Sequence, residues 1–515
     1  TYKTRAGSGR SAFYFKSRPS PPLRRGGGQH PRPAPEHQPG SPVKIHQRFL
    51  TLALSALAAC GEVAIDAPTA QIESALLPTF VIRGEPTRRT SLADRMEELG
   101  VPGVSVAVLV DGEIGWARGY GFADVESRRP VTTDTLFQAA SISKPVAALA
   151  ALQLVQEGLV ALDADVNDYL TSWRVPASEH TSEVPVTLGG LLTHRAGLGV
   201  SGFPGYGPDE LVPDALGVLE GRGNTRPVSV VSSPGKRWLY SGGGYTVMQQ
   251  LITDVRGAPF PDVMRRRVLD PIGMVRSTYE QPIPRDRHDD VATGYRSDGS
   301  PVSGGWHTFP EQAAAGLWTT PSELALYAGE VQRAWRGESS HVLDEALVRA
   351  MLTPDEDNWG LGPGISEDGE RFQHGGSNPG FRSTFAAYID GDHGVFVMTN
   401  SDAGSPLADE IAVTVAETYG WSGPRTAERV PVSLPADVRG QYVGTYVVAE
   451  TGVEFQVALE GRGLALTWRG GNALLWPLSD SMFFDVEDGH EVRFSGERDG
   501  VELVMGSQRV PRDPR

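Results

Sequence analysis

The chain has one cysteine, Cys60, among 515 residues, which excludes a disulfide within it. From residue 60 onward it has two lysines, Lys144 and Lys236, although arginine is plentiful. No methionine precedes Met96, and the apolar run that ends just before Cys60 is too short to cross a bilayer as a helix. These scarcities give the few lysines and the one cysteine unusual weight.

Basic residues are scarce in most of the chain, and the net charge is -16. The first 59 residues hold 10 of the 47 basic and 1 of the 63 acidic residues, which leaves 37 against 62, or -25, for the rest. Nucleic-acid binding needs a basic surface, so we expect no nucleic-acid partner and interpret the excess as a solvated acidic surface. The length predicts two or more domains.

The N-terminal stretch has the pattern of a lipoprotein leader. Residues 1–42 are rich in Pro, Gly and Arg and are expected to be disordered, with translation beginning near Val43. Residues 43–59 fit a signal peptide and residues 60–78 a tether. The run from Leu57 to Cys60 resembles a bacterial lipobox, which implies lipidation at Cys60, anchoring in the cell envelope and, with Gly61 next, the outer membrane. A buried cysteine at a helix end is the alternative.

Two strand pairs enclose a helical region between residues 79 and 425. Residues 103–110 and 114–122 alternate as strands around an Asp111-Gly112 turn, and residues 381–389 and 394–399 form a later pair. We expect an α/β (α+β) domain with a mixed, largely antiparallel sheet, flanking helices and a helical insertion subdomain. Residues 424–435 are expected to be a linker. Short alternating runs in residues 435–515 predict an all-β barrel or sandwich.

One charged side chain, Lys144, interrupts an apolar run from residue 137 to 155. A buried lysine is costly unless it is paired, and Ser141 lies one helical turn before it. Pro145 is tolerated in a first turn, so the pair belongs at a helix start. An arginine could not replace Lys144 as a base, because a guanidinium group keeps its proton. The pattern predicts a serine nucleophile beside a lysine base.

The Ser-x-x-Lys spacing alone is weak evidence, because it occurs three times. The copy at residues 41–44 lies in the leader. The copy from Ser233 to Lys236 spans Pro234-Gly235, a turn, and Lys236 is expected to be solvated. The copy at Ser141 therefore stands out by its helical context.

Two later stretches add to it: Tyr240-Ser241-Gly242, before a predicted helix, and His374-Gly375-Gly376-Ser377, before a predicted strand. With Ser141-x-x-Lys144 they resemble the three ordered motifs of the class C β-lactamase-related serine hydrolases, which include penicillin-binding proteins, DD-peptidases and esterases. The stretch around His194 matches a further landmark of that family, and we interpret His194 as structural.

The resemblance implies roles for these residues. Ser141 attacks a carbonyl and forms an acyl-enzyme, with Lys144 or Tyr240 as the acylation base. Tyr240 passes a proton to the leaving group. The backbone N–H groups of Ser141 and Ser377, with Gly376 beside them, form the oxyanion hole. His374 stands where many β-lactamases carry a lysine.

Gly242 departs from the family, which usually has asparagine after the Tyr-Ser pair. We therefore expect ester or D-amino-acid peptide cleavage of a small-molecule or peptide acyl substrate. A β-lactamase or DD-carboxypeptidase activity, and a catalytically weak penicillin-binding-like envelope protein, remain alternatives. No Gly-x-Ser-x-Gly elbow supports an α/β-hydrolase. No metal or organic cofactor is implied.

Overall fold

The computed structural model describes residues 67–448, 453–469, 471–487, 489–496, 500–505 and 508–513. Cys60, the expected leader, the signal peptide and the first part of the tether lie outside the described residues. Within the described ranges, none of the helices has the length and apolar character needed to span a membrane.

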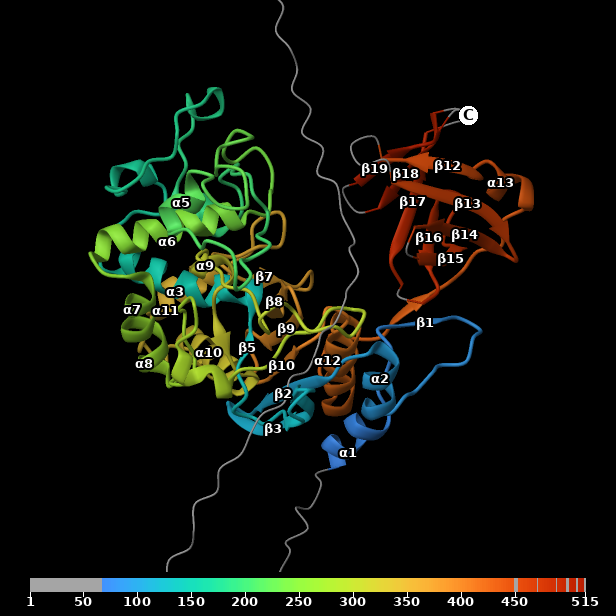
Figure 1. Ribbon diagram of the computed structural model, residues 1–515, viewed down its shortest axis with the longest axis horizontal. Coiled ribbons are helices and arrows are strands. Elements are labelled where there is room, and N and C mark those ends of the chain that lie inside the picture. Colours follow the sequence, from blue (N-terminus) through green and yellow to red (C-terminus); the bar gives the residue numbers. More distant parts are fainter. Residues whose placement is uncertain are drawn as a thin grey trace, which may run out of the picture. The chain divides into compact units, whose positions relative to one another are not determined.

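A seven-stranded sheet organises the chain up to about residue 420, with the order β4-β3-β2-β10-β9-β8-β7 and antiparallel neighbours throughout (Figure 1). Its strands are β2 (Gly103–Val110), β3 (Glu113–Asp124), β4 (Arg129–Pro130), β7 (Gly364–Ile365), β8 (Arg371–Asn378), β9 (Phe381–Tyr388) and β10 (Gly394–Thr399). The early hairpin β2–β3 meets the late hairpin β9–β10 where β2 pairs with β10. The two predicted strand pairs therefore close one sheet, as expected.

Local sequence signals explain the first elements. Asp111 and Gly112 both have positive φ angles, of 53° and 78°, which is the conformation that a two-residue hairpin turn requires. The predicted hairpin turn is therefore confirmed. Helix α2 (Leu92–Leu99) begins after Ser91, whose hydroxyl accepts the Asp94 N–H, and ends at the left-handed Gly100.

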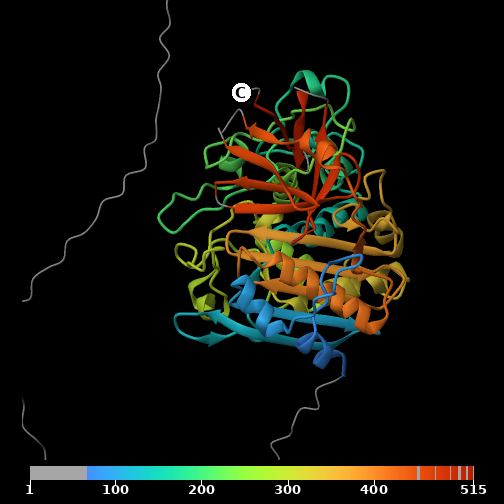
Figure 2. The same cartoon turned by 90° about the vertical axis from the view of Figure 1, so that its right-hand side faces the viewer.

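The pleat of the sheet sorts its side chains into two cores. On β2, Val104, Val106 and Val108 pack with α2, with α1 (Ala67–Ser74) and with α12 (Ser405–Tyr419) on one face. Figure 2 shows the blue and orange helices of this layer lying across the sheet. Ala107 and Leu109 point to the opposite face and join the core around helix α3 (Ser143–Gln156).

Helices and loops of the insertion build the layer on that second face. All of residues 143–154 in α3 are buried, as its apolar residues on every side predicted. The remaining elements of this region are α4 (Leu188–Leu192), α5 (Ala215–Leu219), α6 (Gly242–Arg256), α7 (Phe260–Met264), α8 (Asp270–Ile272), α9 (Gln312–Ala315), α10 (Pro321–Trp335), α11 (Glu345–Leu352), β5 (Phe137–Gln138), β6 (Trp318–Thr319) and the helical turns η1 (Ala140–Ile142), η2 (Val166–Asp168), η3 (Glu179–Thr181), η4 (Arg265–Leu269) and η5 (Arg285–Asp290).

Two stretches have more regular structure than the sequence indicated. Residues 371–378, expected to lead into a strand, themselves form β8, and Gly380 with φ 81° turns the chain into β9. Within the expected linker, β11 (Ala427–Arg429) pairs in parallel with β1 (Phe80–Ile82). The alternation of apolar and polar residues that marks a strand is interrupted by glycines in β8 and is absent from the short, mainly charged β11.

The C-terminal part of the chain is an antiparallel, nearly closed eight-stranded barrel of the kind predicted. Its elements are α13 (Ala436–Gly440), β12 (Gly444–Val447), β13 (Glu454–Glu460), β14 (Gly463–Trp468), β15 (Gly471–Pro477), β16 (Met482–Asp485), β17 (Glu491–Ser495), β18 (Glu502–Met505) and β19 (Gln508–Pro511). Consecutive strands are neighbours, and a bridge between Tyr446 and Arg512 draws the first strand to the end of the last. Inward-facing side chains such as Tyr446, Leu475 and Phe494 fill it.

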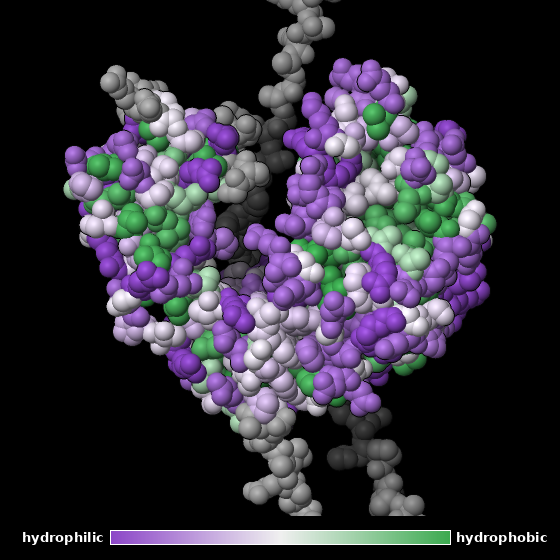
Figure 3. Space-filling view, turned by 180° about the vertical axis from the view of Figure 1, so that it is seen from behind, coloured by the Kyte–Doolittle hydropathy of each residue, from purple (hydrophilic) through white to green (hydrophobic). Residues whose placement is uncertain are grey.

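The surface seen from behind is mainly hydrophilic, with hydrophobic side chains gathered in separate patches (Figure 3). Large apolar side chains are nevertheless exposed at single positions, of which Leu211 at 96% and Val275 at 74% are the most extreme. Scattered exposed apolar residues of this kind are normal in globular domains.

Candidate active site

Ser141 lies at the entrance to the buried helix α3. The chain leaves β5, passes through the helical turn η1 and continues into α3, with Ala140 in the left-handed region at φ 50°. A non-glycine residue in that region is strained, and such strain is commonly found at functional sites. Ser141 is half-buried, whereas the residues on both sides of it are buried. The turn therefore presents one hydroxyl from an otherwise closed segment.

Lys144 reaches back to that hydroxyl, as the sequence predicted. Its Nζ lies 3.0 Å from Ser141 Oγ and 2.8 Å from the carbonyl oxygen of Ala314, to which it donates. The side chain of Lys144 is 2% exposed. Pro145 is in the first turn of α3, where its missing N–H costs nothing. A primary amine is thus held next to a nucleophilic oxygen away from bulk water.

Tyr240 comes to the same place from the far side of the insertion. It precedes Ser241, the N-cap of α6, whose hydroxyl accepts the Gly244 N–H at 2.9 Å. Lys144 Nζ lies 4.9 Å from the centroid of the Tyr240 ring. Ser141, Lys144 and Tyr240, separated by up to 99 residues in sequence, therefore share one site.

Gly376 lets strand β8 approach the nucleophile. A Cβ atom at Gly376 would lie 2.2 Å from the Ala139 carbonyl oxygen and 2.2 Å from Ser383 Oγ, so any side chain is excluded. Ser377 follows on β8 and is exposed, opposite Arg382 in the register with β9. The motif thus brings the Ser377 backbone close to the turn that carries Ser141.

His374, also on β8, is buried and neutral. Its Nδ1 lies 2.6 Å from the Gly375 carbonyl oxygen, and its Nε2 is buried without a hydrogen-bond partner among the described residues. Burial, helped by the positive charge of Lys144, lowers the pKa of His374 to about 3. The His374 side chain therefore carries no positive charge at neutral pH.

Gly242 opens helix α6 and leaves room for an aromatic ring. Its N–H donates to the Ser201 carbonyl oxygen at 3.2 Å, and a Cβ atom placed on it would lie 2.8 Å from Cε2 of Phe203. Phe203 thus occupies the space into which an asparagine at this position would project. The missing asparagine was visible in the sequence, but nothing there indicated the ring that replaces it.

Sequence reasoning underrated the aromatic groups around Tyr240. His194 is 1% exposed, its ring centroid lies 4.3 Å from that of Tyr240, and its Nδ1 accepts the Ser241 N–H at 3.1 Å. Trp359 packs against His194 at 5.1 Å and against His374 at 5.4 Å. Trp238 closes the same cluster, 5.4 Å from Trp359. The matching landmark around His194 was the available signal.

The other candidates lie elsewhere. Lys236 is exposed, and Gly235 between it and Ser233 has φ 78°, so that motif forms a turn and no helix, as expected. Among the described residues, no three His, Cys, Asp or Glu side chains are grouped closely enough to hold a metal ion.

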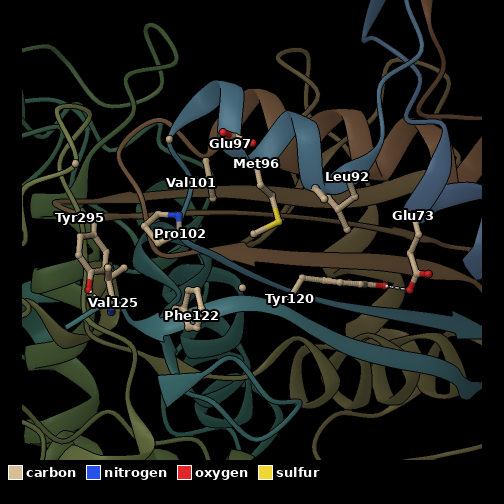
Figure 4. A pocket seen from close by; sticks show the side chains of 14 residues that line it. Glu73, Leu92, Met96, Glu97, Val101, Pro102, Tyr120, Phe122, Val125 and Tyr295 are labelled. Atoms are coloured by element: carbon tan, nitrogen blue, oxygen red, sulfur yellow. Dashed lines mark hydrogen bonds between the residues drawn. The ribbon is translucent and has the colours of Figure 1, made fainter. Parts of the chain in front are cut away.

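A cavity of about 800 Å³ lies between α2 and β3, lined mainly by apolar side chains such as Met96, Pro102 and Phe122 (Figure 4). The hydroxyl of Tyr120 donates to the Glu73 carboxylate at one end of it. None of the candidate site residues lines this cavity, and its polar groups at Glu73 are already paired with each other and with Arg118. We therefore assign the chemistry to the site at Ser141.

This combination of fold and site is typical of serine hydrolases in which a lysine serves the nucleophile. The chain belongs to the β-lactamase family, because the family model described as Beta-lactamase matches residues 89–419.

Relatives and solved structures are consistent with that membership. The chain is 36% identical over 192 residues to the esterase EstB of Burkholderia gladioli, an alignment that covers 35% of this chain and 47% of that protein. It is 24% identical over 413 residues to penicillin-binding protein 4* of Bacillus subtilis, covering 75% and 88%. The octameric penicillin-binding protein homologue from Pyrococcus abyssi shares the fold, with a TM-score of 0.58, 24% identity and coverage of 81% and 98%.

Proposed function

We propose that the protein is a serine hydrolase that cleaves carboxylic esters through an acyl-enzyme on Ser141. The observation that carries the proposal is the 3.0 Å contact between Ser141 Oγ and the buried Lys144 Nζ. A serine is a weak nucleophile until a nearby base takes its proton. The similarity to a protein named as an esterase supports the same class of substrate.

The reaction then proceeds by ordinary acyl transfer. Ser141 Oγ attacks the ester carbonyl and gives its proton to the unprotonated form of Lys144, which is the base that we propose for acylation. Tyr240, next to Lys144, relays a proton to the departing alkoxide, so that an alcohol leaves and Ser141 carries the acyl group. Water then attacks the acyl-enzyme, and the acid is released with Ser141 restored.

The negative charge on the carbonyl oxygen requires hydrogen-bond donors. We propose the backbone N–H groups of Ser141 and Ser377, because Gly376 allows β8 to pass against Ala139 beside the nucleophile. One such donor contributes about 3 to 4 kcal/mol to transition-state stabilisation in another serine hydrolase.

Two features favour esters over β-lactams. Phe203 fills the space next to Gly242, so no side-chain amide is available there to bind a substrate amide. His374 is neutral, so the site lacks the cation that a lysine would offer to a substrate carboxylate. Both changes remove groups that recognise an amide or an anion, and neither one impairs attack on an ester.

A β-lactamase or D-amino-acid peptidase activity is the second candidate. It is favoured by the long alignment with penicillin-binding protein 4* and by the fold shared with other penicillin-binding-like proteins. A catalytically weak envelope protein would retain the fold and lack turnover.

A substrate panel separates these candidates. We expect the purified protein to hydrolyse p-nitrophenyl esters faster than nitrocefin or D-alanyl peptides, and a fluorophosphonate to add its mass to wild type but not to Ser141→Ala. Ser233→Ala, from the copy of the motif that forms a turn, is the matched control and should behave as wild type. No labelling of wild type, or labelling of Ser141→Ala, would refute the mechanism.

We also propose that Cys60 carries a lipid anchor that holds the enzyme in the cell envelope. The support is the sequence pattern alone, with small residues before Cys60 and a basic and apolar stretch ahead of it. Mass spectrometry of the protein expressed in a bacterial host should find an N-terminus at Cys60 with a diacylglycerol mass, and Cys60→Ala should abolish it. An unmodified N-terminus upstream of Cys60 would contradict the proposal.

A further inference from the structure

His194 bonds to the chain on both sides of Tyr240. The N–H of Leu239 donates to the backbone carbonyl oxygen of His194 at 2.8 Å. The N–H of Ser241 donates to the His194 ring at Nδ1, at 3.1 Å. One residue therefore accepts the backbone N–H groups that immediately precede and follow the tyrosine.

The conformation of His194 suits this task. It follows helix α4 and has φ 61°, in the left-handed region that histidine adopts at a cost. That conformation turns its carbonyl oxygen and its ring toward the same short segment. The ring is buried and lies 4.3 Å from the Tyr240 ring, with Trp359 at 5.1 Å on another side. The imidazole is thus fixed by packing.

The hydrogen bond also defines the tautomer. Because the Ser241 N–H donates to Nδ1, that nitrogen carries a lone pair and the ring proton lies on Nε2. Burial, and next the positive charge of Lys144, hold the pKa of His194 well below its usual value, so the ring stays neutral. A protonated ring would point an N–H at another N–H and break the contact.

We propose that His194 is a positioning residue for catalysis, which fixes the Tyr240 backbone so that its ring stands beside Lys144. The inference rests on the proposed function, since it assigns to Tyr240 the proton relay of that mechanism. Proton transfer requires atoms within hydrogen-bond reach, and a displacement of about 1 Å can cost about a hundredfold in rate. His194 acts through Tyr240 and does not touch the substrate.

The test compares two substitutions with a matched control. His194→Asn keeps an acceptor near the position of Nδ1, and asparagine tolerates a positive φ. His194→Leu keeps an apolar side chain of similar bulk without an acceptor. Thr193→Val removes a neighbouring hydrogen bond, from the Thr193 hydroxyl to the Gly189 carbonyl oxygen at 2.9 Å, and leaves both contacts at Tyr240 intact.

We expect His194→Leu to lower kcat for a p-nitrophenyl ester about a hundredfold with KM changed less than about threefold, in protein whose circular dichroism is that of wild type. His194→Asn should recover at least about tenfold of that loss, and Thr193→Val should keep wild-type kcat. Melting temperatures of all three variants show whether the loss in kcat merely follows stability.

Three outcomes overturn the inference: a wild-type kcat in His194→Leu, an equal loss in His194→Asn and His194→Leu, or an equal loss in Thr193→Val at equal melting temperature. If His194→Leu does not fold, the comparison of His194→Asn with His194→Gln, whose longer side chain displaces the acceptor, decides in its place. Wild type without esterase activity would instead refute the proposed function, so the two failures are distinguishable.

Discussion

Replacement of Lys144 by arginine tests whether the site needs a base or only a positive charge. Arginine keeps the charge and the hydrogen-bond donors, but its guanidinium stays protonated in proteins and cannot accept the proton of Ser141. If Lys144 is the base, Lys144→Arg should therefore be almost as inactive as Lys144→Ala.

The contacts of the Lys144 amine show how poorly arginine would fit, and the contribution of general base catalysis gives the expected size of the loss. Lys144 Nζ has two acceptors, Ser141 Oγ and the Ala314 carbonyl oxygen, in a site where the side chain is 2% exposed. The five donors of a guanidinium exceed what these two oxygens satisfy, and each unsatisfied buried donor costs about 1 to 3 kcal/mol. General base catalysis contributes about 10² to 10⁴ in rate, so kcat for both variants should fall by about that factor.

The assay is steady-state hydrolysis of a p-nitrophenyl ester, with the burst of p-nitrophenol measured by stopped flow to isolate acylation. Both variants should lose the burst. Lys236→Arg is the matched control, because Lys236 is the other lysine after residue 60 and is exposed. A Lys144→Arg enzyme with more than about a tenth of the wild-type kcat would refute the assignment of Lys144 as the base.

Three further predictions concern single positions. Gly376→Ala should abolish activity and lower the melting temperature, because its Cβ would lie 2.2 Å from two oxygen atoms. Gly375→Ala is the control and should be tolerated, because the nearest atom to its Cβ would be 3.8 Å away. Equal effects of the two substitutions would contradict this packing. Gly242→Asn should lose esterase activity because Phe203 is 2.8 Å from the new Cβ, and adding Phe203→Ala should restore it and raise the rate on nitrocefin relative to esters. His374 is neutral in the folded protein, where its pKa is about 3, whereas in the unfolded protein it takes up a proton below about pH 6.5. As the pH falls from about 6 to about 4, protonation of the unfolded state should therefore lower the free energy of unfolding by up to about 1.4 kcal/mol per pH unit. When the free energy of unfolding is measured by urea denaturation at several pH values, His374→Asn should show a weaker dependence on pH than wild type. The same pH dependence in both proteins would contradict the burial of a neutral ring.

The sequence predicted the parts of the fold that depend on local signals. Strong alternation and an Asp-Gly turn predicted the hairpin β2–β3, and a helix apolar on every side predicted the burial of α3. The strand β8 was missed because its glycines, needed for close approach at Gly376, weaken the alternating pattern by which strands are recognised.

The candidate site divides along the same line. Ser141 and Lys144 are one helical turn apart, so elementary helix geometry alone is enough to place their side chains together. The contacts of His194 and Phe203 connect loops that are distant in sequence, and no periodicity relates them. The catalytic pair of such a site can therefore be predicted from sequence when both residues lie one helical turn apart. The groups that position it and shape its specificity become visible only when the insertion is folded around that helix.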